Sequence, residues 1–132
     1  MNTPVATCKP CADRLHQIDI RKTSLDGQRA LVTGSNSGIG EAVLRGLAEA
    51  GAAVVLNYVS NDERAEMIVS EIREAGGRAI AIKADVSRED QVQAMFRQAC
   101  AELGSIDILV NNAGLQKDAP LHEMTLAQWQ FV

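Results

Sequence analysis

The stretch 30–40, with the sequence ALVTGSNSGIG, constrains the fold of this chain more than any other stretch. A short apolar run leads into a loop with three glycines, and an amphipathic segment follows directly. This order predicts a strand, a tight turn and a helix. We expect Gly34 to turn the chain sharply, Gly38 to let the backbone approach a pyrophosphate, and Gly40 to let the helix pack close to the strand. The anion would lie at the helix N-terminus, where free N–H groups and the macrodipole favour negative charge.

Hydrophobic periodicity predicts that strands and helices alternate along the rest of the chain. Between the helices we expect short buried strands. The connections between strands and helices are short, which requires right-handed crossovers between parallel strands. The pattern therefore predicts an α/β fold with a doubly wound parallel sheet in the strand order 3-2-1-4. The predicted strands span 30–32, 53–56, 79–84 and 106–110. The predicted helices span 39–50, 60–76 and 87–103, and a last helix follows Thr125. We expect a capping box of Ser60 and Glu63 at the second helix, Ser87 at the start of the third and Thr125 as the cap of the last.

Length and charge exclude several classes of protein. A chain of 132 residues suffices for one domain with a modest core, and its formal net charge of −4 comes without a stripe of Lys or Arg that would bind nucleic acid. No apolar stretch approaches the roughly 20 residues that span a bilayer, and the N-terminus has no apolar signal core. We therefore expect no nucleic-acid or membrane partner and a cytoplasmic location.

Residues 1–24 are polar, contain two prolines and show no sustained period, so we expect a flexible N-terminal extension before a domain at 25–132. Cys8 and Cys11 form a Cys-x-x-Cys pair with His16 nearby, which raises the alternative of a zinc or redox site. A zinc site would lack a convincing fourth ligand, and a redox pair would open a helix after a strand. We interpret the two thiols as incidental and expect no metal site.

Polar residues and glycines follow the predicted strands, where ligands bind open α/β sheets. The stretch 57–60 (NYVS) after the second strand has no acid to hold the ribose hydroxyls of NAD and no Arg for a 2′-phosphate. The missing acid favours a protein that uses NADP, or both NADP and NAD, over one that uses NAD alone. Asn36 and Ser60 are candidate hydrogen-bond donors to the phosphate of NADP. The third strand is followed by 85–86 (DV) and the fourth by 111–114 (NNAG).

Together, TGSNSGIG at 33–40, Asp-Val at 85–86 and NNAG at 111–114 resemble the motifs of the short-chain dehydrogenase/reductase family. The resemblance covers about residues 25–132 and implies part of a Rossmann fold that binds NADP or NAD. The stretch from 115 onward is similar to glucose 1-dehydrogenase and 3-oxoacyl reductase members. The family also implies that the complete enzyme is a homo-oligomer, either a tetramer or a dimer.

The resemblance assigns roles to the strand-end residues. It implies that 34–40 cradle the pyrophosphate, that Asp85 and Val86 contact the adenine, that 112–114 lie beside the nicotinamide ribose, and that Asn111 braces the sheet. The residues expected to bind the cofactor are Gly34, Ser35, Asn36, Ser37, Gly38, Ile39, Gly40, Tyr58, Asp85, Val86, Asn112, Ala113 and Gly114.

The proton donor that the family uses is not found in this sequence. The family supplies a Tyr followed four residues later by a Lys, with a Ser upstream and a helix Asn, and the Lys lowers the pKa of the Tyr. The single tyrosine here, Tyr58, is followed by Asp62 at that distance, and no lysine has a tyrosine four residues before it. We expect a Rossmann half-domain truncated in its fifth helix, without catalytic residues and inactive alone. His122 is expected to be a solvated loop residue.

Three functions are compatible with the sequence. The first is the NAD(P)(H)-binding N-terminal part of an oxidoreductase that transfers hydride between the cofactor and an alcohol or carbonyl. The second is a non-catalytic nucleotide-binding remnant, or a partner that lends its half-site to another chain. The third is a metal-binding leader at Cys8 and Cys11, which zinc titration of a Cys8→Ser variant would test.

Overall fold

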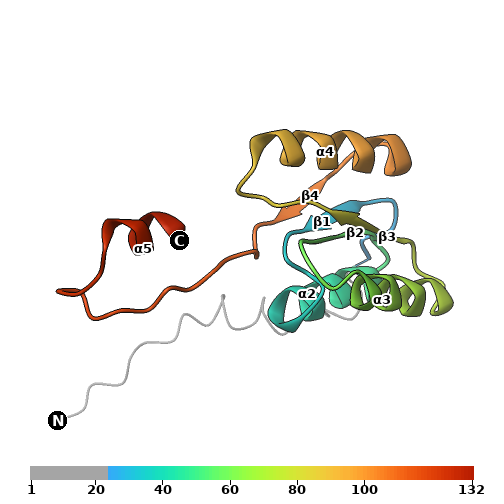
Figure 1. Ribbon diagram of the computed structural model, residues 1–132. Helices are drawn as coiled ribbons and strands as arrows, with labels where there is room; N and C mark the ends of the chain where they lie inside the picture. Colours follow the sequence, from blue (N-terminus) through green and yellow to red (C-terminus); the bar gives the residue numbers. More distant parts are fainter. Residues whose placement is uncertain (1–23) are drawn as a thin grey trace, which may run out of the picture.

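The computed structural model describes residues 24–132 and contains one four-stranded parallel sheet (Figure 1). Its strands are β1 (Arg29–Val32), β2 (Ala53–Tyr58), β3 (Ala79–Lys83) and β4 (Ile108–Val110). They lie in the order β3-β2-β1-β4, and every pairing is parallel. The predicted fold class and strand order are confirmed. The predicted extension, with Cys8 and Cys11, lies outside the described residues except for Ser24.

Helices cover both faces of the sheet (Figure 1). Helices α2 (Gly38–Glu49) and α3 (Asp62–Glu74) lie on one face, and α4 (Glu89–Leu103) lies on the other. A parallel sheet needs this cover because its strands are apolar on both faces. Because all four strands run parallel, their carboxyl ends lie at one edge of the sheet.

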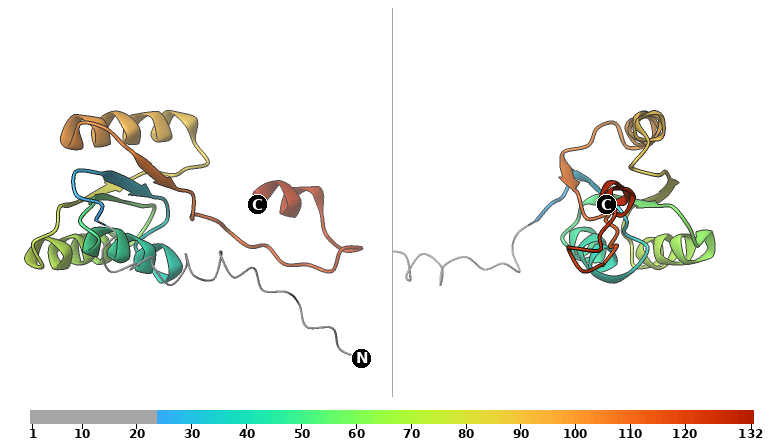
Figure 2. Two further views of the ribbon diagram at one scale, coloured as in Figure 1. Left: turned by 180° about the vertical axis from the view of Figure 1, so that it is seen from behind. Right: turned by 60° about the vertical axis from the view of Figure 1, so that its left-hand side comes forward.

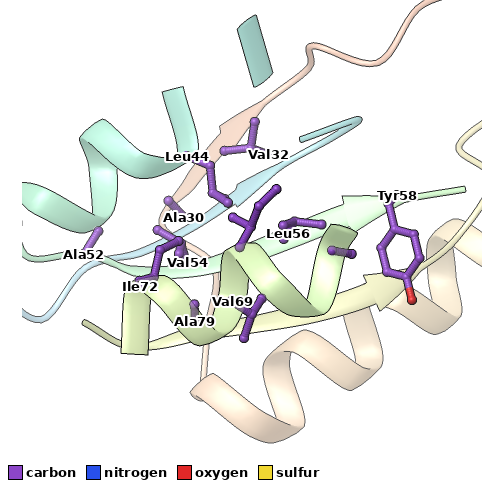
Figure 3. Packing of buried hydrophobic residues seen from close by; sticks show 12 residues of the cluster. Ala30, Val32, Leu44, Ala52, Val54, Leu56, Tyr58, Val69, Ile72 and Ala79 are labelled. Atoms are coloured by element: carbon purple, nitrogen blue, oxygen red, sulfur yellow. The ribbon is translucent and has the colours of Figure 1, made fainter. Parts of the chain in front are cut away.

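Two apolar clusters form the core, one on each side of the sheet. Alternate residues of each strand point to opposite faces, so the strands supply both clusters. The cluster beneath α2 and α3 includes Ala30, Val32, Leu44, Val54, Leu56, Ile68 and Val69 (Figure 3). The cluster beneath α4 includes Leu31, Val55, Ile80, Ile82, Met95, Ala99 and Leu103, with Phe96 packed against it.

Two predicted helix starts are wrong. The capping box at Ser60 is absent, since Asn61 is the N-cap of α3 and its side chain accepts a hydrogen bond from the N–H of Arg64 at 3.2 Å. Asn61 has a φ of 65°, a left-handed conformation that asparagine tolerates better than most residues. Helix α4 begins at Glu89, because Ser87 donates its N–H and its hydroxyl to the carboxylate of Asp85 instead of capping a helix.

Two strand boundaries differ from the prediction by two residues, and two others by one. Strand β2 continues through Asn57 and Tyr58, which pair with Ile82 and Lys83 of β3. The sequence predicted a strand that ends at Leu56, because the apolar run ends there and the next residue, Asn57, is polar. Strand β4 begins at Ile108, two residues later than predicted.

The last helix, α5 (Leu126–Phe131), begins with a capping box between Thr125 and Gln128, which confirms Thr125 as its cap. None of its residues is buried. Figure 2 shows the segment after β4 running away from the sheet to this helix. Between residues 24 and 132, no helix is long and apolar enough to cross a membrane.

Candidate dinucleotide-binding site

The loop between β1 and α2 uses its glycines where other residues do not fit. Gly34 and Gly38 have φ values of 61° and 57°, in the left-handed region that glycine adopts without a Cβ clash. A Cβ on Gly34 would lie 2.9 Å from the Cα of Ala113. A Cβ on Gly40 would lie 2.5 Å from the carbonyl oxygen of Gly34 and would also collide with the side-chain amide of Asn112. The lack of a side chain at Gly34 and Gly40 therefore allows the loop to pack directly against Ala113 and Asn112.

The N-terminus of α2 suits an anion. Its N-cap residue, Ser37, has an extended backbone and makes no capping hydrogen bond with its side chain. A Cβ added to Gly38 would meet no atom within 4 Å, and Ile39 is 78% exposed. The first N–H groups of the helix thus lack a side-chain cap, and a bulky group has space beside Gly38. A diphosphate fits this combination of free donors, positive dipole end and open approach.

The segment after β4 braces the glycine loop from one side. The hydroxyl of Thr33 accepts the N–H groups of Asn112 and Ala113, both at 3.0 Å. The side-chain amide of Asn112 donates to the carbonyls of Thr33 and Gly34 at 2.9 and 3.0 Å. Asn112 therefore braces the glycine loop. Asn111, for which the family resemblance implies a role in bracing the sheet, is exposed.

The end of β2 braces the same loop from the other side. Asn57 accepts the N–H of Gly34 on its side-chain oxygen at 3.2 Å and the N–H of Ser35 on its backbone carbonyl at 2.9 Å. The amide of Asn36 donates to the carbonyl of Ser60 at 2.7 Å, so one donor that we expected for a phosphate already has a partner. Hydrogen bonds from β2 and from the segment after β4 therefore hold the loop on both sides.

Asp85 and Val86 follow β3 at the same edge of the sheet. The N–H and then the hydroxyl of Ser87 hold the pKa of Asp85 below its usual value, so this carboxylate is ionised at neutral pH. The N–H of Asp85 donates to the side chain of Gln91 at 2.8 Å. Val86 is 39% exposed and offers an apolar surface to a ligand.

Tyr58 differs from the other predicted site residues. We expected it in a loop after the second strand, but it lies within β2 and is only 7% exposed. Its ring belongs to the apolar cluster beneath α2 and α3 (Figure 3). Burial raises the pKa of Tyr58, and the nearby charge of Asp62 raises it further, so the phenol stays protonated. Its place among the cofactor contacts remains a prediction.

Sequence reasoning missed two residues that hold the site together, Thr33 and Asn57. Both are polar residues at the ends of apolar strands, and both are buried. A buried polar residue needs hydrogen-bond partners, and loop N–H groups at a sheet edge can supply them. The sequence shows a polar residue at each strand end, but it shows neither the burial of these residues nor their partners. His122 lies away from the site and its side chain is 81% exposed.

A cavity of about 540 Å³ lies at the opposite edge of the sheet. It is lined by residues at the C-terminal ends of α2 and α3 and the turns that follow, including Glu49, Gly51, Ala75 and Gly76. Helix C-termini carry partial negative charge and disfavour anions. Two arginines and three carboxylates also line the cavity, so acidic groups outnumber basic ones there. The glycine loop at the other edge therefore remains the candidate site for a pyrophosphate.

Comparison with known proteins agrees with this geometry. The family model for short chain dehydrogenases matches residues 28–132. The chain is 43% identical over 110 residues to the 3-oxoacyl-[acyl-carrier-protein] reductase of Synechocystis sp., an alignment that covers 83% of this chain and 44% of that protein.

Two solved structures share the fold over most of this chain. A dehydrogenase/reductase from Sinorhizobium meliloti 1021 superposes with a TM-score of 0.80 at 46% identity, over 85% of this chain and 44% of that one. A gluconate 5-dehydrogenase from Burkholderia cenocepacia J2315, in complex with NADP and tartrate, gives 0.76 at 45% identity, with the same two coverages. The chain spans less than half the length of these relatives. It belongs to the short-chain dehydrogenase family.

Proposed function

We propose that this chain binds NADP(H) or NAD(H) at the carboxyl edge of its sheet. The observation that carries the proposal is the uncapped N-terminus of α2, which begins at the glycine loop with open space beside Gly38. A negatively charged diphosphate is the ligand that such a terminus favours. A dinucleotide also extends to both sides of its diphosphate, and candidate contacts lie on both sides here.

We assign the parts of the cofactor to three corners of this edge. Residues 34–40 would cradle the pyrophosphate with their N–H groups. Asp85 and Val86, at the end of β3, would contact the adenine. Residues 112–114, at the end of β4, would lie beside the nicotinamide ribose. The strand order supports this assignment, because β1 lies between β2 and β4 and the order of the strands reverses there.

We propose NADP(H) as the preferred cofactor. Residues 59–61, which follow β2, carry no carboxylate that would repel a 2′-phosphate. The nearest acid in sequence, Asp62, binds the amine of Lys83 at 2.9 and 3.2 Å. The gluconate 5-dehydrogenase of Burkholderia cenocepacia, which is similar to this chain, was solved with NADP.

The activity that we propose for the whole protein is hydride transfer between NAD(P) and an alcohol or carbonyl substrate. The nicotinamide ring, when bound, supplies the hydride chemistry. The residues described here bind and orient the cofactor. We further propose a homo-oligomeric enzyme, in line with the family resemblance.

A second candidate is a nucleotide-binding chain without turnover of its own, or one that contributes a half-site to another chain. The burial of Tyr58 is the observation in its favour, because a phenol packed in the apolar core is poorly placed to give a proton to a substrate. The two candidates differ in turnover and share cofactor binding. An in-frame Tyr-x-x-x-Lys encoded downstream of residue 132, with oxidation of NADPH by the product of that longer reading frame, would support the oxidoreductase. Binding of NADPH without oxidation by that product would support the second candidate.

A Gly38→Val substitution tests the binding site. We expect it to abolish binding of NADP(H), because the side chain occupies the space beside the α2 N-terminus. The matched control is Gly27→Val, since Gly27 also has a positive φ of 80° with no atom within 4 Å of an added Cβ, but precedes β1 at the opposite edge. Titration followed by NADPH fluorescence measures the affinity. Equal affinity of the Gly38→Val variant and the wild type would refute the site.

A further inference from the structure

We propose that Asn57 is a positioning residue that holds the glycine loop and the Asp85 corner at a fixed separation. This inference rests on the proposed function, because that separation matters only if one ligand contacts both corners. Asn57 would touch no part of the cofactor. It would act through the backbone groups that its side chain holds.

The side chain of Asn57 connects the two neighbouring corners. Its Oδ1 accepts the N–H of Gly34, the first glycine of the loop, at 3.2 Å. Its Nδ2 donates to the carbonyl of Ala84 at 2.9 Å, with a longer contact to the carbonyl of Ile82 at 3.4 Å. Ala84 directly precedes Asp85. A single amide group therefore spans from the proposed pyrophosphate cradle to the proposed adenine contact.

The identity of the partners fixes the orientation of this amide. A backbone N–H can only donate and a carbonyl can only accept, so the oxygen of Asn57 must face Gly34 and its nitrogen must face Ala84. Among the residues that could replace it, few offer a donor and an acceptor at this spacing. An aspartate offers both only when its carboxyl group is protonated.

Burial makes the connection rigid. Asn57 is 1% exposed and lies in β2, which pairs with β1 and β3 on its two sides. Water cannot replace a buried hydrogen bond easily, so loss of the side chain would leave the Gly34 N–H and the Ala84 carbonyl without partners. Asparagine is also disfavoured within strands, and its presence in an otherwise apolar run is explained by these contacts.

The first test compares Asn57→Ala with Ile72→Val, a control in the core of α3 near the opposite edge of the sheet. We expect Asn57→Ala to weaken NADP⁺ binding about tenfold or more, as the loss of buried hydrogen bonds predicts. The control should bind like the wild type even when its urea midpoint falls. Calorimetric titration of the full chain gives the affinities. Wild-type affinity in Asn57→Ala would overturn the inference.

The second test uses pH to restore the missing donor. In Asn57→Asp, a carboxylate would face the carbonyl of Ala84 at pH 8, whereas the protonated form can donate to that carbonyl and still accept from Gly34. Burial raises the pKa of such a group. We expect the ratio of variant to wild-type NADP⁺ affinity to rise about tenfold between pH 8 and pH 5. Asp85 and Glu41, the carboxylates of the adjoining elements, have lowered pKa values and stay ionised over this range.

The outcomes separate this inference from the proposed function. If the wild type binds neither NADP⁺ nor NAD⁺, the proposed function fails and the inference fails with it. If the wild type binds and the Asn57→Asp ratio is the same at every pH, only the inference fails. A ratio that rises at low pH supports both, because a residue that merely fills space would not respond to its own protonation.

Discussion

At the residue scale, Thr33 joins the glycine loop to the segment after β4, a role that its position before the glycines did not indicate. It is 6% exposed, and its hydroxyl accepts the N–H groups of Asn112 and Ala113. The same hydroxyl donates to the carbonyl of Val110 at 3.4 Å. One side chain thus fixes the segment after β4 against the glycine loop, and residues 112–114 depend on it for their place.

We predict that Thr33→Val destabilises the fold by about 1–3 kcal/mol, because two partly buried N–H groups lose their acceptor. The substitution preserves the shape of the side chain, so packing stays nearly constant. Thr33→Ser keeps the hydroxyl and is the matched control, with a smaller loss. Urea unfolding followed by circular dichroism measures both. Equal stability of Thr33→Val and the wild type would show that water satisfies these groups.

The glycines of the site could be predicted from sequence, whereas its bracing residues could not. A positive φ at Gly34 or Gly38 follows from the local need for a tight turn, which a short motif reveals. The partners of Asn57 and Asn112 lie 23 and 79 residues away in the chain. Such pairs depend on which strand ends meet, and a single sequence gives no direct signal of that.

At the element scale, an ion-pair network links α2 to α3 close to the site. Glu41, one residue after the last glycine of the loop, accepts two hydrogen bonds from Arg64 of α3 at 2.9 and 2.8 Å. Arg45 binds Glu41 and also Glu71 of α3. The network holds the start of α2 against its neighbour, which stabilises the helix terminus that faces the proposed pyrophosphate.

Glu41→Gln should lower the stability by about 1 kcal/mol at pH 7, since these pairs are partly exposed and screened. Burial raises the pKa of Glu41, but the hydrogen bonds and charges of Arg64 and Arg45 outweigh it and hold the pKa below the usual 4.5. A lowered pKa contributes stability above the unfolded value and loses it as the pH falls through the folded value.

The difference between the wild type and Glu41→Gln should therefore shrink when the pH is lowered from 7 to 3. Urea unfolding at both pH values measures it. Glu66→Gln, which changes an exposed carboxylate on α3, is the control and should show little difference at either pH. A difference that persists unchanged at pH 3 would contradict the ion-pair account.

The existence and order of the elements could be predicted better than their ends. Buried apolar runs and helical stripes give a strong periodic signal, and all four strands were found. Boundaries depended on competing hydrogen bonds. Ser87 binds Asp85 rather than capping α4, and Asn61 caps α3 from a left-handed conformation. Local patterns offered several possible caps, and the fold selected among them.

At the scale of the whole molecule, the parallel order β3-β2-β1-β4 gathers the functional residues at one edge. Residues far apart in sequence, from the glycine loop to the segment after β4, meet there only because every strand runs in the same direction (Figure 1). The sheet topology was predictable because short crossovers leave few arrangements. The placement of 115–132, which extends away from the sheet, was not predictable from local patterns (Figure 2).

The most direct test of the account is a map of backbone amide chemical-shift changes when NADP⁺ is added to the 132-residue chain. We predict that the changes concentrate at 34–40, 85–86 and 112–114, with the amides of the α2 N-terminus moving most. Changes centred on the cavity at the opposite edge, around 49–51 and 75–78, or no changes at millimolar NADP⁺, would contradict the assignment of the glycine loop to the pyrophosphate.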